Sequence, residues 1–275
     1  IELGKFNTLE VVKTVDFGVY LDGKEEGEIL LPTRYVPENC VPGDLLNVFL
    51  YLDNEERLIA TTLTPLVQVG EFACLEVAWV NEFGAFLNWG LMKDLFVPFR
   101  EQKMKMQVGK SYVVHAHIDE ESYRIVASAK IERYLSKETP TYQAGAEVDI
   151  LIWQKTDLGF KAIIDQQFPG LLYDSEIFQS LRTGMTLKAF VKQVRPDGKI
   201  DLILQKPGAA KVDDFASSLL DYIKEHGGAV KLNDKTPADD IYQIFGVSKK
   251  TFKKAVGDLY KKHLIVLTDN GLKLA

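Results

Sequence analysis

The sequence predicts a mainly β chain of three tandem five-stranded barrels, followed by a C-terminal α+β domain. The first observation is a set of glycine triplets with the same steps of 14 and 25 residues: Gly4, Gly18 and Gly43; Gly70, Gly84 and Gly109; Gly145, Gly159 and Gly184. The second is that five short runs rich in β-branched and aromatic residues accompany each triplet. The third is a change from strand to helical periodicity after Leu204.

The composition is that of a globular chain, with 275 residues, 46% of them hydrophobic and 26% charged. No apolar run is long enough to span a membrane, and the residues after Ile1 do not resemble a signal peptide. Cys40 and Cys74 lie in different copies and offer no disulfide framework, which favours a reducing cytoplasm. Because the chain does not begin with Met, we expect its natural start to lie upstream.

The first copy is expected over residues 1–63, with strands at 9–15, 19–21, 28–31, 45–52 and 58–62. The acidic segment 53–56 between its last two strands is typical of a hairpin loop. Residues 32–41 should cross the end of the barrel as a loop or a single helical turn.

The second copy, residues 64–134, repeats this order at 74–80, 83–87, 95–98, 112–118 and 124–128. After a linker at 136–140, the third copy, residues 135–206, has its runs at 147–154, 158–161, 170–173, 186–194 and 199–204. The net charges of the three copies and of residues 207–275 are −7, −1, 0 and +2. A polyanionic partner should therefore be steered toward the C-terminal half.

Residues 207–275 are predicted to form a winged-helix domain, which begins after a linker at 205–210. Asp213 and Asp214 should cap a first amphipathic helix that runs to His226. The remaining signals are a second helix at 237–245, a third at 249–263 capped by Ser248, and a hairpin of 264–268 and 272–274 around Asp269-Asn270-Gly271. Helix, helix, turn, helix and hairpin is the winged-helix order, related to helix-turn-helix readers.

Five strands per copy and a glycine-marked bend suggest the oligonucleotide-binding (OB) fold. The residues that carry a family resemblance are, in the first copy, Gly4, residues 11–15, Phe17-Gly18-Val19-Tyr20, Leu30-Leu31-Pro32, Gly43-Asp44 and residues 53–57. This order, which recurs in the other two copies, resembles the RNA-binding domain first described in ribosomal protein S-one. With a winged helix after three such domains, the chain also resembles the bacterial conserved virulence factor B family, a group of RNA-binding regulators.

This resemblance implies that aromatic residues beside the bend, and a basic residue of the last hairpin, face the nucleic acid. Bases stack on aromatic rings at roughly 1–3 kcal/mol each, while a cation follows the phosphates. The residues that match these positions are Phe83, Phe86 and Arg124 in the second copy and Phe17, Tyr20 and Arg57 in the first. The alternative for each aromatic pair is that its rings are buried in the core. Because the first copy is acidic, it could also be a structural barrel that does not bind nucleic acid.

The third copy departs from this pattern, because Leu158 and Lys161 stand where aromatic residues are expected. Lys199 occupies the basic position, and Tyr173 stands where the family often has histidine. We therefore expect this copy to contact phosphates rather than stack on bases. Phe17 and Tyr20, which are three residues apart, share a face only if Gly18 bends or bulges the strand.

The third helix of the winged-helix domain carries lysines opposite its apolar stripe. Those nearest its start, our candidates for contact with phosphates, are Lys249, Lys250, Lys253 and Lys254. No Arg, Asn or Gln accompanies them, which argues against base-specific readout. A solvated surface and a protein-docking face are the alternatives for this helix.

No catalytic constellation is recognisable in the sequence, because it has no Gly-rich phosphate loop, nucleophile elbow or paired catalytic carboxylates. His115 and His117 lack a third metal ligand nearby, so we expect neither a metal nor a cofactor. The sequence thus predicts a non-catalytic, cytoplasmic RNA-binding regulator that holds single-stranded RNA across several modules. A DNA-binding transcriptional regulator led by the winged helix and a protein-interaction scaffold remain open.

Overall fold

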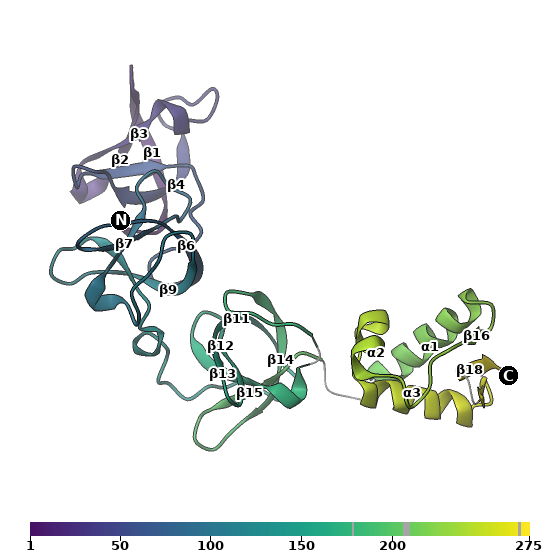
Figure 1. Ribbon diagram of the computed structural model, residues 1–275. Coiled ribbons are helices and arrows are strands. Elements are labelled where there is room, and N and C mark those ends of the chain that lie inside the picture. Colours follow the sequence, from purple (N-terminus) through teal and green to yellow (C-terminus); the bar gives the residue numbers. More distant parts are fainter. Residues whose placement is uncertain (178, 206–209, 269–270) are drawn as a thin grey trace. The chain divides into compact units, whose positions relative to one another are not determined.

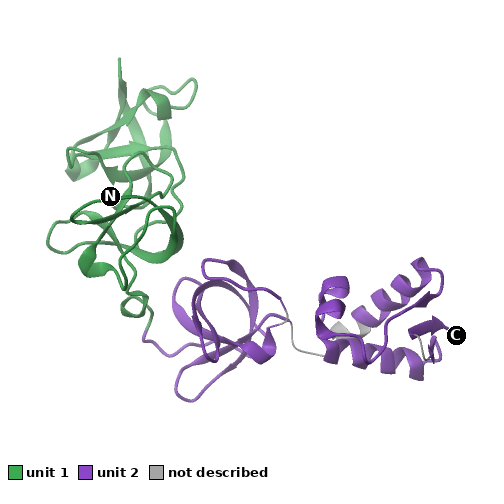
Figure 2. Ribbon diagram, viewed as in Figure 1, with its two compact units in different colours: residues 1–136 green, residues 137–275 purple. Residues whose placement is uncertain are grey.

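The computed structural model describes residues 1–177, 179–205, 210–268 and 271–275 (Figure 1). The chain divides into two compact units, residues 1–136 and 137–275 (Figure 2). No helix of the described part is long and apolar enough to cross a membrane. The finer division into modules at 1–63, 64–134, 135–206 and 207–275 remains our proposal.

Three closed five-stranded barrels are present, which confirms the predicted fold class. The strands of the first are β1 (Phe6–Val15), β2 (Gly18–Asp22), β3 (Glu28–Pro32), β4 (Leu45–Leu52) and β5 (Leu58–Thr61). The strands of the second are β6 (Phe72–Val80), β7 (Gly84–Leu87), β8 (Leu95–Pro98), β9 (Ser111–Ile118) and β10 (Ile125–Ser128). The strands of the third are β11 (Glu147–Thr156), β12 (Gly159–Ile164), β13 (Phe168–Tyr173), β14 (Thr186–Val194) and β15 (Ile200–Ile203).

All three barrels have the same strand order, which for the first is β1-β2-β3-β5-β4. The third and fifth strands pair in parallel, as at Leu30 and Ile59, and the fourth strand pairs back onto the first. A single 3-10 turn, Thr33–Tyr35 in the first barrel, follows the third strand and confirms the helical turn expected there. This strand order is that of an OB fold.

The middle glycine of each triplet is required by close packing at the start of the second strand. A Cβ atom on Gly18, Gly84 or Gly159 would lie 2.2, 2.3 or 1.9 Å from a carbonyl oxygen of the third strand. A β-bulge that all three barrels have in common lies in the first strand, where the register shifts on either side of Val12, Ala78 and Trp153. The register shift near the aromatic pairs thus lies in the first strand and not at the middle glycine.

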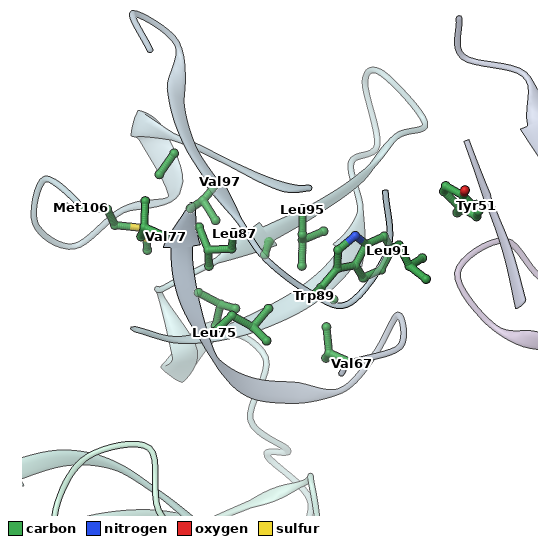
Figure 3. Close-up of a cluster of buried hydrophobic side chains, with 14 of the residues drawn as sticks. Tyr51, Val67, Leu75, Val77, Leu87, Trp89, Leu91, Leu95, Val97 and Met106 are labelled. Carbon is green, nitrogen blue, oxygen red and sulfur yellow. The ribbon is translucent and has the colours of Figure 1, made fainter. Parts of the chain in front are cut away.

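The first barrel has a hydrophobic core of its own but also contributes side chains to the core of the second barrel, which we call the shared core. Phe49 and Tyr51 of β4 belong to the same buried cluster as Trp89 and Leu91 of the second barrel, and Figure 3 shows Tyr51 beside Trp89 and Leu91. The rings of Phe49 and Trp89 meet edge to face, with centroids 5.7 Å apart. Because the two barrels bury side chains against each other, the β4–β5 hairpin of the first barrel has a fixed place beside the second.

The C-terminal domain is a winged helix, as predicted. Its elements are α1 (Ala210–Glu225), β16 (Ala229–Val230), α2 (Ala238–Phe245), α3 (Lys249–Lys261), β17 (Ile265–Thr268) and β18 (Gly271–Leu274). Its core includes Phe215, Leu219, Ile241, Phe252 and Leu259. The three-stranded sheet has the order β16-β18-β17.

The predicted helix ends of this domain are partly confirmed. The Ser248 side chain accepts a hydrogen bond from the Thr251 backbone N–H at 3.1 Å, so it caps α3 as expected. α1 begins at Ala210, earlier than the start that we expected at Asp213 and Asp214. Most of the expected 205–210 linker, at 206–209, and the hairpin turn at 269–270 lie outside the described residues.

His115 and His117 of β9 pack together with Tyr134. The His115 ring is 7% exposed and stacks on the Tyr134 ring at a centroid distance of 4.1 Å. The Tyr134 hydroxyl lies 3.2 Å from Nε2 of His117. Burial lowers the pKa of His115 to about 4, and the neighbouring His117 adds to this effect.

Replacing Trp89 by Ala should lower the free energy of unfolding of residues 1–136 by about 3–5 kcal/mol, because the substitution leaves a cavity in the shared core. Chemical denaturation of the full chain measures this loss. Trp79, which is 45% exposed, supplies the control: its Ala variant should lose far less. Equal losses for the two variants would contradict a shared core that depends on Trp89.

The stability of the same unit should fall as the pH drops from 6.5, the ordinary pKa of histidine, toward the value of about 4 for folded His115. In this window the unfolded state binds a proton at His115 that the folded state does not, so lowering the pH favours unfolding, by at most about 3 kcal/mol. Denaturation at several pH values should show a flatter dependence for His115→Phe, which keeps an aromatic ring. Identical pH profiles for the two proteins would rule out His115 as the source.

Candidate nucleic-acid interface

The second barrel carries three aromatic rings across neighbouring strands, Trp79 of β6, Phe86 of β7 and Phe96 of β8, which we call the aromatic strip. Trp79 pairs with Phe86 in the β6–β7 ladder, and Phe86 pairs with Phe96 in the β7–β8 ladder. The Trp79 and Phe86 rings are stacked, with centroids 3.7 Å apart and an angle of 2° between their planes. The Phe86 and Phe96 centroids are 4.8 Å apart.

Strand alternation and one bulge place these rings on the outer face. Leu95 and Val97 are buried, so Phe96 between them points outward. Trp79 reaches the same face because the register of β6 shifts between Val77 and Trp79. The second and third strands of an OB fold, here β7 and β8, form the face that binds oligonucleotides in this architecture.

The aromatic strip borders a groove with a volume of about 760 Å³. Phe83, with an exposed fraction of 64%, lines this groove and also a second hollow of about 500 Å³ that continues toward Phe99 and Arg100. The structure therefore brings together three of our candidates from the second copy, which line the groove: Phe83, Phe86 and Arg124. The groove has the size of a site for a small ligand or for a short piece of a polymer.

The cations of this groove are in ion pairs. Arg124 Nε lies 2.8 Å from the Glu56 carboxylate, and Lys93 Nζ lies 3.3 Å from the same carboxylate. Arg100, in the adjoining hollow, lies 2.7 Å from Asp119. Exposed pairs of this kind contribute about 0–1 kcal/mol each, so an incoming phosphate can replace the carboxylate.

In the first barrel the three positions equivalent to the aromatic strip hold Lys13, Tyr20 and Leu30, since these residues pair in the matching ladders. Lys13 Nζ lies 4.8 Å from the centroid of the Tyr20 ring, and the Phe17 and Tyr20 rings are T-shaped to each other, with centroids 6.3 Å apart. Arg57, our basic candidate, is bound by the Asp53 carboxylate at 2.8 Å and by Glu55 at 2.9 Å. This barrel therefore offers less aromatic surface, beside a cation that its own hairpin neutralises.

In the third barrel the equivalent positions hold Gln154, Lys161 and Leu171. Lys161 Nζ lies 5.1 Å from the centroid of the Trp153 ring, and Leu158 has an exposed fraction of 62%. No ring occupies these three positions, so this barrel presents a cation where the second presents stacked aromatic rings.

The other two candidates of the third barrel are held by charged neighbours. The Arg195 guanidinium donates to the Tyr173 hydroxyl and lies 2.8 Å from Asp201, while Lys199 pairs with Asp197 at 2.9 Å. All three basic residues of the last hairpins that we proposed as phosphate contacts, Arg57, Arg124 and Lys199, are thus paired with carboxylates.

The start of α3 shows the opposite situation. Lys250, Lys253 and Lys254 are exposed and Lys249 is half-buried, and within the described residues none of these four lysines forms an ion pair. Lys249 and Lys253, like Lys250 and Lys254, are like charges four residues apart, and all four lie near the positive end of the helix. Such a placement costs helix stability, so an anion bound here would offset a real repulsion.

Sequence reasoning missed Trp79, Phe96 and Lys93. The alternation of Leu95, Phe96 and Val97 was a usable signal for Phe96. Trp79 could be placed only by knowing that β6 bulges at Ala78. Lys93 lies in the loop between β7 and β8, and its side-chain partners, Asp53 and Glu56, belong to the first barrel.

Family models match two parts of the chain: residues 3–63 match an S1 domain, and residues 217–274 match a CvfB-like winged helix domain. Both are nucleic-acid-binding types of domain, and neither is a catalytic one. A crystal structure of a multidomain protein with nucleic acid binding domains from Streptococcus pneumoniae covers 99% of this chain and 98% of its own, with 24% identity and a TM-score of 0.45.

Full-length relatives are also similar to the chain. Conserved virulence factor B of Staphylococcus epidermidis is 21% identical, over 96% of this chain and 91% of that protein. The Staphylococcus aureus protein of the same name is 22% identical, over 81% of this chain and 77% of its own length. The protein YitL of Bacillus subtilis is 30% identical over 94% of this chain and 89% of that protein, and the chain therefore belongs to the conserved virulence factor B family, which these relatives share.

Proposed function

We propose that the chain is a non-catalytic regulator that binds single-stranded RNA, with the aromatic strip of the second barrel as its main base-contacting surface. The observation that carries this proposal is the row of Trp79, Phe86 and Phe96 along a groove with cations at its edge. Stacking requires bases whose faces are accessible, as they are in a single strand and not in a duplex.

The third barrel and α3 add contacts with phosphates in this proposal. Lys161, Lys199 and the lysines at the start of α3 supply positive charge without a row of rings. Modules joined in one chain raise one another's effective concentration, so several weak contacts together give a high overall affinity. We infer a role in post-transcriptional control in the cytoplasm, consistent with the virulence link in the name of the staphylococcal relatives.

A second candidate function, binding of duplex DNA through the winged helix, is favoured by the lysines at the start of α3, which form no ion pair within the described residues. Lysines without Arg, Asn or Gln contact phosphates and do not read bases, so such binding would be nonspecific. Competition between a duplex DNA and a single-stranded RNA for the full chain separates the two functions, because binding led by the barrels prefers the single strand. A chain that binds neither at low salt would support the protein-docking alternative.

Replacing Phe96 by Leu should weaken the binding of a short polyuridine RNA by about 1–2 kcal/mol, through the loss of one stacking ring. Leu is suited to this position, because the first and third barrels carry Leu30 and Leu171 there. Fluorescence anisotropy measures the affinity, and Tyr20→Leu in the first barrel is the matched control. If the control loses as much affinity as Phe96→Leu, the second barrel is not the main base-contacting surface.

The double substitution Lys250→Glu and Lys253→Glu should weaken RNA binding and also stabilise the winged helix, by about 1 kcal/mol. It makes both like-charge pairs along α3 opposite in charge and places acidic groups near the helix start. The dependence of the logarithm of affinity on the logarithm of salt concentration should become shallower by about 1.4, the value for two lost phosphate contacts.

Lys231→Glu with Lys235→Glu makes the same change of net charge elsewhere in the domain and serves as the control. Denaturation and binding are measured on all three proteins. Unchanged affinity and salt dependence for the α3 variant would remove the winged helix from the proposed interface.

A further inference from the structure

The first barrel supplies one wall of the groove on the second barrel. Tyr51, Leu52, Asn54 and Glu56, from β4 and the β4–β5 hairpin, line the same volume of about 760 Å³ as the aromatic strip. This wall is held in place by the shared core, to which Tyr51 belongs, and by Lys93, whose Nζ donates to the Asp53 carbonyl oxygen at 2.7 Å. The groove is thus built from two barrels that differ in net charge, one strongly acidic and one nearly neutral.

Glu56 reaches from this wall to both cations at the edge of the groove. Its Oε2 lies 2.8 Å from Arg124 Nε, and its Oε1 lies 3.3 Å from Lys93 Nζ. One carboxylate therefore bridges two cations of the second barrel with its two oxygens. Two non-bridging oxygens of an RNA phosphate would bridge the same cations in the same way.

The hairpin fixes the backbone of Glu56, but the ion pairs of its carboxylate with Arg124 and Lys93 are weak. The backbone of Glu56 is left-handed, with φ of 64°, and its N–H donates to the Asp53 carbonyl oxygen at 3.1 Å. The side chains of Glu56, Lys93 and Arg124 are 39%, 33% and 57% exposed, so water screens both pairs. The carboxylate can therefore swing away from the cations without unfolding the hairpin.

We propose that Glu56 is a built-in competitor for RNA phosphate, through which the first barrel gates the groove of the second. A strand that enters the groove must displace Glu56 before a phosphate reaches Arg124 and Lys93. Polyanions that bring charge alone meet this competition, whereas a single strand is also held by stacking on the aromatic strip. The inference rests on the proposed function of the groove and assigns the acidic first barrel a regulatory role at the same site.

The test compares Glu56→Gln with Glu55→Gln in the full chain, using a fluorescein-labelled polyuridine oligoribonucleotide over a range of salt concentrations. The two substitutions remove the same charge from the same hairpin, but Glu55 pairs with Arg57 at 2.9 Å and does not line the groove. Glu56→Gln should bind about three- to tenfold more tightly at low salt, with a salt slope steeper by about 0.7–1.4, because one or two cations become available to phosphates. Glu55→Gln should change the affinity less than about twofold.

Adding Arg124→Gln to the Glu56→Gln variant should abolish most of the gain, since the freed cation is then absent. Denaturation midpoints confirm that the variants are folded. If Glu56→Gln does not fold, Glu56→Gly removes the same carboxylate and suits the left-handed backbone.

Equal gains for Glu55→Gln and Glu56→Gln would overturn the gate, because the effect would then be general charge repulsion. Unchanged or weaker binding by Glu56→Gln would overturn it as well. These results differ from failure of the proposed function, in which neither the unaltered chain nor any variant binds the oligoribonucleotide at low salt. A chain that binds RNA and loses affinity on Phe96→Leu, yet does not respond to Glu56→Gln, keeps the proposed function and loses only the gate.

Discussion

The packing of Trp89 against Phe49 is the contact on which the groove depends. It belongs to a core that both N-terminal barrels share, so their relative placement is set by buried apolar surface and not by a flexible connection. Without this contact the β4–β5 hairpin would have no fixed place beside the aromatic strip. Glu56 would then have no defined distance to Arg124 and Lys93. The ion pairs at the edge of the groove therefore depend on the packing of Trp89 against Phe49 in the core.

The same three ladder positions carry a different chemistry in each barrel. The bulge in the first strand and the close approach at the middle glycine fix where these side chains point, whatever the side chains are. The three sets, in chain order, are Lys13, Tyr20 and Leu30; Trp79, Phe86 and Phe96; and Gln154, Lys161 and Leu171. The backbone thus provides one geometry three times, and only the second barrel uses it for a continuous row of rings.

Local patterns were enough to predict the barrels, because strand alternation, turn residues and the glycine triplets each depend on only a few neighbouring residues. They were not enough for the groove. Trp79 faces Phe86 because of a bulge that the sequence does not mark, and α1 begins at Ala210, before the start that its sequence pattern predicted. Glu56 looked like an ordinary acidic turn residue, because its partners Lys93 and Arg124 belong to another barrel. What could not be predicted depends on register and on contacts between modules.

The ion pairing of basic residues differs along the chain, and under the proposed function this difference indicates which part of the chain would attract RNA first. Arg57, Arg124 and Lys199 are each balanced by a carboxylate, so their attraction for a distant polyanion is small. The lysines at the start of α3 form no such pairs within the described residues, so their field extends into the solvent. Long-range attraction should therefore act first at the winged helix, and stacking in the second barrel should follow once the strand is tethered. In the order that we propose, the acidic first barrel would not prevent RNA binding; it would make binding depend on bases that can stack on the aromatic strip.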